Sequence, residues 1–125
     1  METRESKITV YKYHNLGLSE LKRKVDYRKE NFIINHHNEI KDFSFNWFHN
    51  IAYFSANIII DVIELGIKID VLTGGHLIAD ESRITFYLKS IIPKKLFYRL
   101  KSIIHKEIRN EIKCILGVKL PLAAA

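Results

Sequence analysis

The chain has 125 residues, 47% of them apolar and 27% charged, and its 20 lysines and arginines exceed its 14 acids to give a formal net charge of +6. This length and composition predict one globular domain and exclude a disordered chain. The positive charge favours an anionic partner, nucleic acid first. One cysteine excludes a disulfide framework. The polar N-terminus lacks the apolar segment of a signal peptide, and the apolar stretches are too short for a membrane span, so we expect a cytoplasmic protein with no membrane partner.

The first third of the chain predicts a strand, a charged segment and a hairpin. Residues 1–6 are expected to form a flexible tail, and residues 7–13 alternate as a strand does. Residues 18–30 carry sparse apolar side chains among many charges, which indicates a surface helix or an arm that orders on binding. Residues 31–35 and 39–45 are hairpin candidates, and a polar Asn-His-His-Asn segment lies between them.

The most apolar stretch, residues 46–65, predicts a central helix. On a helical wheel its large side chains cover most of the circumference and leave a narrow line of Asn, Asp and Glu, so most of its surface should be buried. Gly66 follows at once and suits the left-handed residue that ends a helix.

The rest of the chain predicts two strands, a basic helix and a last strand. Residues 67–72 and 83–89 alternate cleanly, with a tight turn expected at Thr73-Gly74-Gly75-His76. Pro93 then opens an amphipathic helix over 93–109, at a favoured first-turn position. Its wheel pattern breaks near residue 110, and the alternation from Glu111 to Leu116 favours a strand.

These elements predict an α+β protein: a single two-layer domain, residues 1–122, with a mostly antiparallel sheet. The sheet is expected to pack on the buried central helix (46–65) and on the basic amphipathic helix (93–109). Residues 123–125 have the look of a vector-derived tail and are left out of the fold prediction.

The outer face of the basic helix is the most informative predicted surface. It gathers cations with one tyrosine and one histidine and contains no acid, so it would follow a phosphate backbone while the tyrosine stacks on a base. Solvation of an ordinary amphipathic helix explains the same pattern equally well. A basic cluster near residue 23 extends the surface. The predicted nucleic-acid-binding residues are Lys94, Lys95, Tyr98, Arg99, Lys101, His105, Lys106 and Arg109, with Lys22, Arg23 and Lys24.

No catalytic, metal or cofactor site is predicted. His36 and His37 are adjacent, so their side chains should point apart, and no second pair of ligands lies at zinc-site spacing. A small nuclease that uses His36, His37 or His105 is the least favoured function.

From residue 52 to 119 the chain resembles the C-terminal domain of the polymerase-suppressor (PSP-one) family, which includes the YaaT-like proteins. Residues 80–87, DESRITFY, are similar to the family's Asp-x-x-Lys-Leu-Thr-Phe-Tyr, and residues 97–100, FYRL, to its Phe-Arg-Glu-Leu. Residues 112–114 stand where the family has Ile-Glu-Leu, and residues 117–119, GVK, resemble its Gly-Val-Arg. The resemblance implies a non-catalytic protein of RNA metabolism. The family's clustered cysteines are missing, so iron–sulfur binding is not carried over.

The favoured function is therefore a small, non-catalytic nucleic-acid-binding or RNA-metabolism adaptor, with RNA or a single strand as the preferred partner. The alternative is a protein-interaction module, such as a phage-type inhibitor or an antitoxin-like partner, that uses an apolar patch or an open strand edge. The basic helix would equally dock an acidic protein. A homodimer stays open in either case.

Overall fold

The computed structural model describes residues 2–36 and 40–120. In the described residues, five strands and two helices follow one another with two short 3-10 turns between them. In chain order they are β1 (Thr3–Tyr13), α1 (Leu18–His36), β2 (Ile40–Phe48), β3 (Ile51–Val62), η1 (Ile63–Leu65), β4 (Ile67–Ala79), β5 (Arg83–Pro93), η2 (Lys94–Leu96) and α2 (Phe97–Gly117).

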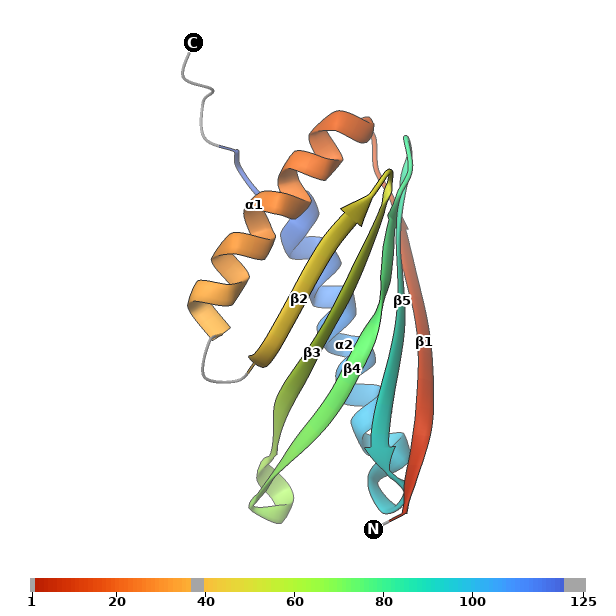
Figure 1. Cartoon of the computed structure of the whole chain (residues 1–125), viewed down its shortest axis with the longest axis vertical. Coiled ribbons are helices and arrows are strands. Elements are labelled where there is room, and N and C mark those ends of the chain that lie inside the picture. Colours follow the sequence, from red (N-terminus) through yellow and green to blue (C-terminus); the bar gives the residue numbers. More distant parts are fainter. Residues whose placement is uncertain (1, 37–39, 121–125) are drawn as a thin grey trace.

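The five strands form one antiparallel sheet in the order β1-β5-β4-β3-β2. The first strand therefore lies beside the last, and the meander from β2 to β5 completes the sheet. Both helices cover the same face, and the other face is open (Figure 1). The predicted α+β class and the mostly antiparallel sheet are confirmed.

The predicted central helix at 46–65 is wrong, because this stretch forms the end of β2, all of β3 and the turn η1. Its apolar residues also satisfy a period of two: Ala52, Ala56 and Val62 are buried on the helix-covered face. Tyr53 and Asp61 point to the open face and are exposed. The isoleucine run at its centre favours a strand, since β-branched side chains lose more rotamer freedom in a helix.

The predicted strand at 111–116 is also wrong, since α2 continues to Gly117. Ile112 and Ile115 are buried against α1 and the sheet. Glu111 falls in the inward sector, which made the helical pattern appear to break. In the folded protein the carboxylate meets Arg28 of α1, at 2.7 Å from Nε to Oε1.

Three smaller expectations differ from the structure. Residues 3–6 are not a flexible tail but begin β1, where Thr3 to Ser6 pair in register with the end of β5. Residues 31–35 belong to α1, which removes the first arm of the expected hairpin; of its tip, residues 37 and 38 lie outside the described part of the chain. The expected turn at 73–76 lies inside β4, where Gly75 is needed for close strand approach.

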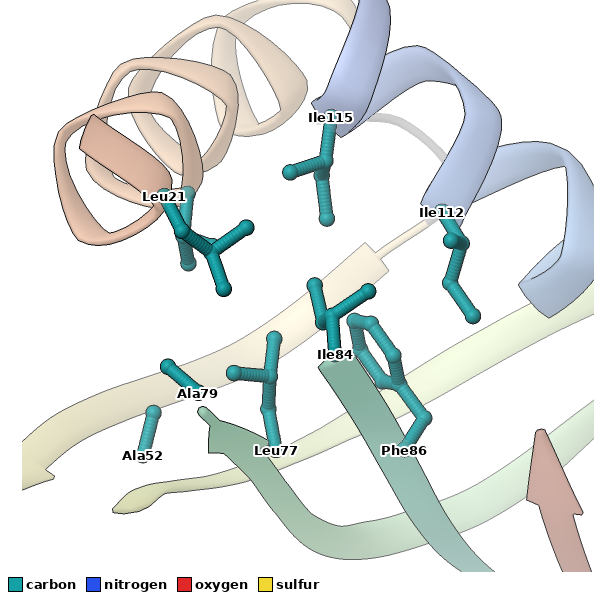
Figure 2. Packing of buried hydrophobic residues seen from close by; sticks show 9 residues of the cluster. Leu21, Ala52, Leu77, Ala79, Ile84, Phe86, Ile112 and Ile115 are labelled. Atoms are coloured by element: carbon teal, nitrogen blue, oxygen red, sulfur yellow. The ribbon is translucent and has the colours of Figure 1, made fainter. Parts of the chain in front are cut away.

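The core lies between the helices and the covered face of the sheet, in two clusters. One joins α1 and the C-terminal half of α2 to the sheet, with Leu21 and Ile115 pointing toward Ile84 and Phe86 (Figure 2). The other packs the N-terminal half of α2 on β1 and β5, with Leu100 and Ile92 fully buried. Partly buried Val10, Phe54 and Ile108 contact both clusters.

Candidate functional site

An apolar cavity of about 130 Å³ lies between the two helices and the sheet. Every strand but β1, and both helices, contribute to its wall. The lining residues are Val25, Arg28, Lys29, Ile40, Phe43, Phe45, Phe54, Ala56, Ile58, Thr73, Leu77, Phe86, Leu88, Ile108, Glu111 and Ile115.

The cavity wall includes two small side chains in the middle of the covered sheet face, Ala56 and Thr73. These two are register partners on β3 and β4, and both are buried; Ser90 and Ser6 continue the row on β5 and β1 outside the cavity wall. Gly75 comes two residues after Thr73 on the same face. Side chains this short cannot fill the space beneath the helices, so part of it stays empty.

A bulge in β2 places two aromatic rings at the cavity wall. The register between β2 and β3 shifts between Lys41 and Ser44, and Asp42 within the bulge has φ of 55°. Phe43 and Phe45 follow with nearly parallel rings, whose centroids are 6.3 Å apart. Lys29 Nζ of α1 lies 4.9 Å from the Phe45 ring centroid, so a cation borders this wall.

Charged groups in the cavity wall are concentrated where α1 meets α2. Arg28 contacts Glu111 at two points, Nε to Oε1 at 2.7 Å and Nη2 to Oε2 at 3.0 Å. The hydrogen bond to Glu111 is the main cause that raises the pKa of Arg28, so the guanidinium stays charged. The Thr73 hydroxyl is 3.2 Å from the Ser90 hydroxyl, so these two buried groups form a hydrogen bond within the sheet.

The cations predicted on the basic helix do share one face of η2 and α2. Tyr98 is 76% exposed, and Lys94, Lys95, Arg99, Lys106 and Arg109 are exposed as well, whereas Lys101 and His105 are half-buried. Two of the cations contact acids from other elements: Lys94 lies 3.5 Å from Glu2 and Arg99 lies 3.2 Å from Glu64.

The lysines of the second predicted cluster, on α1, contact other elements of the protein and do not join the α2 face. Lys22 Nζ donates to the His49 carbonyl at 2.9 Å and lies over the Trp47 ring. Lys24 Nζ donates to the Leu116 carbonyl at 3.2 Å, where it satisfies the C-terminal end of α2. Arg23, between them in the sequence, is exposed. The three cations therefore do not extend the α2 face as one surface.

Sequence reasoning missed both the cavity and one cation of the α2 face. Lys113 was assigned to a strand, but it is exposed on α2 four residues after Arg109 and thus on the same side. The cavity residues of β3 were assigned to a helix, so no cavity was expected. The signal that points to it is the pair of small residues Ala56 and Thr73, which are register partners in the cavity wall.

No group of three or more metal-ligating side chains is gathered among residues 2–36 and 40–120. Cys114 is exposed on α2 and lies outside the cavity wall. None of the helices in the described part of the chain is long and apolar enough to cross a membrane.

Fold and site together define an α+β protein whose five-stranded antiparallel sheet is covered on one face by two helices, with an apolar cavity between the layers. No protein-family model and no curated protein matches the chain. The resemblance to the polymerase-suppressor family therefore stays a prediction.

Solved structures do match the fold. The protein TTHA0849 from Thermus thermophilus superposes with a TM-score of 0.54 at 8% identity, over 89% of this chain and 94% of that one. A norcoclaurine synthase point mutant from Thalictrum flavum, in complex with a transition-state analogue, gives 0.47 at 7% identity over 94% of each chain. The di-domain ARO/CYC BexL from the BE-7585A biosynthetic pathway gives 0.45 at 6% identity over 90% of this chain and 48% of its own. At such identities the first likeness concerns the fold alone, and the other two are too loose to bear on function.

Proposed function

We propose that the protein binds a small apolar molecule, or the apolar end of a larger one, in the cavity between sheet and helices. The observation that carries this proposal is the cavity itself, about 130 Å³ in volume and walled mainly by Phe, Ile, Leu and Val side chains. An engineered cavity of similar size and lining stays dry and takes up benzene or xenon. A space of this kind fits one aromatic ring or a short alkyl chain.

The charges in the wall give such a ligand an orientation. Its apolar part would contact Phe54, Phe86 and Ile108, while a polar substituent would lie near Arg28 and Glu111. Few polar groups and a mostly apolar wall are typical of small-molecule sites.

NMR titration with benzene and with indole tests the proposal directly. The methyl signals of Leu77, Leu88, Ile108 and Ile115 should shift in a saturable way, because their side chains line the cavity. The Ala56→Leu variant should lose these shifts, since the added carbons would occupy the empty space.

The matched control is Ser55→Leu, one residue earlier on β3 but exposed on the opposite face of the sheet. It should bind as the wild type does. Equal binding by the Ala56→Leu variant, or no methyl shift in the wild-type protein near the solubility limit of both probes, would refute cavity binding.

A second candidate function, nucleic-acid binding, rests on one observation: the exposed cations of α2 and η2 occupy a continuous face. Lys113 also lies on this face. No acid of α2 lies on it, because Glu107 and Glu111 are on other sectors of the helix. Reversing Arg99 and Lys106 to Glu together should weaken binding of single-stranded RNA and flatten its salt dependence.

The control for this second candidate is the same change of charge at Lys41 and Lys68, two exposed lysines on β2 and β4. Equal weakening by both double variants would mean that only net charge matters, and the α2 face would lose its special role.

A further inference from the structure

The open face of the sheet carries large apolar side chains that no described element covers. Tyr53 is 52% exposed, Leu72 58% and Tyr11 57%. Tyr87 and Ile91 on β5 are also exposed on this face. Exposed apolar surface that continues across several strands is typical of a binding surface.

Three of the rings form a row across the centre of this face. Tyr53, His76 and Tyr87 are register partners on β3, β4 and β5. The Tyr53 and His76 ring centroids are 5.9 Å apart, and those of His76 and Tyr87 are 4.7 Å apart with 21° between the planes. The row ends at Thr9 of β1, a short side chain that leaves Tyr87 accessible on that side.

Larger side chains of the open face cover a smaller one between them. Thr85, the outward residue before Tyr87, is only 4% exposed although no helix covers it. Its neighbours on this face are Tyr11 and Ile78 in register and Arg83 and Tyr87 along the strand, so these larger groups enclose it.

Positive charge borders the row of rings on both sides. Lys7 and Lys89 are register partners just beyond Tyr87, and Arg83 lies on the other side, with Cζ 5.6 Å from the Tyr11 ring centroid. From the Lys7–Lys89 pair to Arg83, none of the outward-facing residues of the described strands is acidic. Glu5, 4.0 Å from Lys89, is in the next row, and an ion pair this exposed contributes little.

We infer that this open sheet face binds single-stranded nucleic acid. Stacking on aromatic side chains and attraction of phosphates to flanking cations are the two interactions by which proteins hold unpaired strands. Here Tyr87, His76 and Tyr53 supply rings, and Lys7, Lys89 and Arg83 supply charge.

The surface lies on the side of the sheet opposite to α2 (Figure 1), so it is distinct from the basic helix face and from the cavity. The two nucleic-acid surfaces are thus separable by mutation, and the outcome does not depend on whether the cavity binds a ligand.

The test is fluorescence anisotropy with labelled single-stranded RNA and DNA of about a dozen nucleotides, within the range that one stacking platform covers, and with duplex DNA. The Tyr87→Ala variant should weaken single-strand binding about fivefold or more, since stacking on one ring contributes about 1–3 kcal/mol per base. Tyr87→Phe keeps the ring and should bind almost as the wild type does. Lys89→Glu should weaken binding and reduce its salt dependence.

Tyr27→Ala is the matched control, because Tyr27 on α1 is 37% exposed, close to the 36% of Tyr87, and is on neither of the two nucleic-acid surfaces. It should leave affinity unchanged. Unchanged affinity in Tyr87→Ala with loss in Tyr98→Ala would overturn the inference and assign binding to the helix. Tighter binding of duplex than of single strands, no binding at low salt, or a dimer that Tyr87→Ala dissociates would overturn it as well.

Discussion

Arg28 of α1 and Glu111 of α2 form a two-point ion pair that joins the two helices beside the cavity, with contacts of 2.7 and 3.0 Å. Both side chains are about one-fifth exposed, at 20% and 21%. Planar, two-point pairing of this kind is stronger than a single hydrogen bond.

We therefore expect Arg28→Ala and Glu111→Ala each to lower the free energy of unfolding by about 1–2 kcal/mol. A double-mutant cycle, measured by urea unfolding, should give a favourable coupling energy. The control cycle uses Arg99 and Glu64, whose side chains are 47% and 74% exposed. That pair should couple by less than about 1 kcal/mol. Equal coupling in the two cycles would contradict a special role for the interhelical pair.

Gly75 and Gly74 are adjacent in β4 but differ in the space around them. A Cβ added at Gly75 would lie 1.9 Å from the Tyr87 carbonyl oxygen, a backbone atom that cannot move aside. At Gly74 the nearest atom, the Phe54 carbonyl oxygen, would be at an ordinary 3.5 Å.

Gly75→Ala should therefore destabilise the protein by more than about 3 kcal/mol, because β4 and β5 would have to separate. Gly74→Ala should be neutral or stabilising by up to about 1 kcal/mol, since it restricts the unfolded chain. Thermal unfolding of both variants checks the difference. Similar melting temperatures would show that β4 and β5 are not in such close contact at Gly75.

Trp47 on β2 donates from Nε1 to Asp26 Oδ1 on α1 at 2.7 Å. Asp26→Ala should lower the free energy of unfolding by about 1–3 kcal/mol, because the half-buried indole N–H loses its acceptor. Asp26→Asn keeps an acceptor oxygen and should cost less. Trp47 is the single tryptophan, so its fluorescence reports the unfolding of each variant. An equal loss for Asn and for Ala would mean that the carboxylate charge, and not the acceptor oxygen, stabilises this contact.

The elements that the sequence predicted well are those whose pattern has one interpretation. In β5 the alternation of Ile84, Phe86 and Leu88 with polar residues fits a strand and no helix, and β1 is similar. A helix was also rightly predicted near residues 97–109 from its apolar side chains, but its predicted start at Pro93 is wrong, because Pro93 ends β5 and Lys94–Leu96 form η2 before α2 begins.

The failures arose where tertiary contacts decide between two periods. In residues 51–62 the core face is entirely apolar and the open face also carries Ile51, Tyr53 and Ile59, so the apolar residues fitted a helical wheel as well as an alternation. Glu111 appeared to end a helix because its partner Arg28 lies 83 residues away in the sequence. The cavity wall brings Ala56 and Thr73 together in register, and no local pattern displays that pairing.

Thr73 and Thr85 are both buried threonines of the sheet, yet only one has a hydrogen-bond partner. The Thr73 hydroxyl is 3.2 Å from that of Ser90, whereas the Thr85 hydroxyl has no partner among the described residues. Their exposed fractions are similar, 3% and 4%. The two sites therefore compare a satisfied buried hydroxyl with an unsatisfied one.

Thr73→Val should destabilise the protein by about 1–3 kcal/mol, because it leaves the Ser90 hydroxyl buried without a partner. Adding Ser90→Ala should recover most of that loss, since no unpaired group then remains. Thr85→Val should instead stabilise by about 1 kcal/mol, because it removes a polar atom that makes no hydrogen bond. Urea unfolding of these variants and the wild type measures whether each change raises or lowers the free energy of unfolding. A loss of stability in Thr85→Val as large as that in Thr73→Val would mean that the Thr85 hydroxyl has a partner in solution, such as an ordered water at the open sheet face.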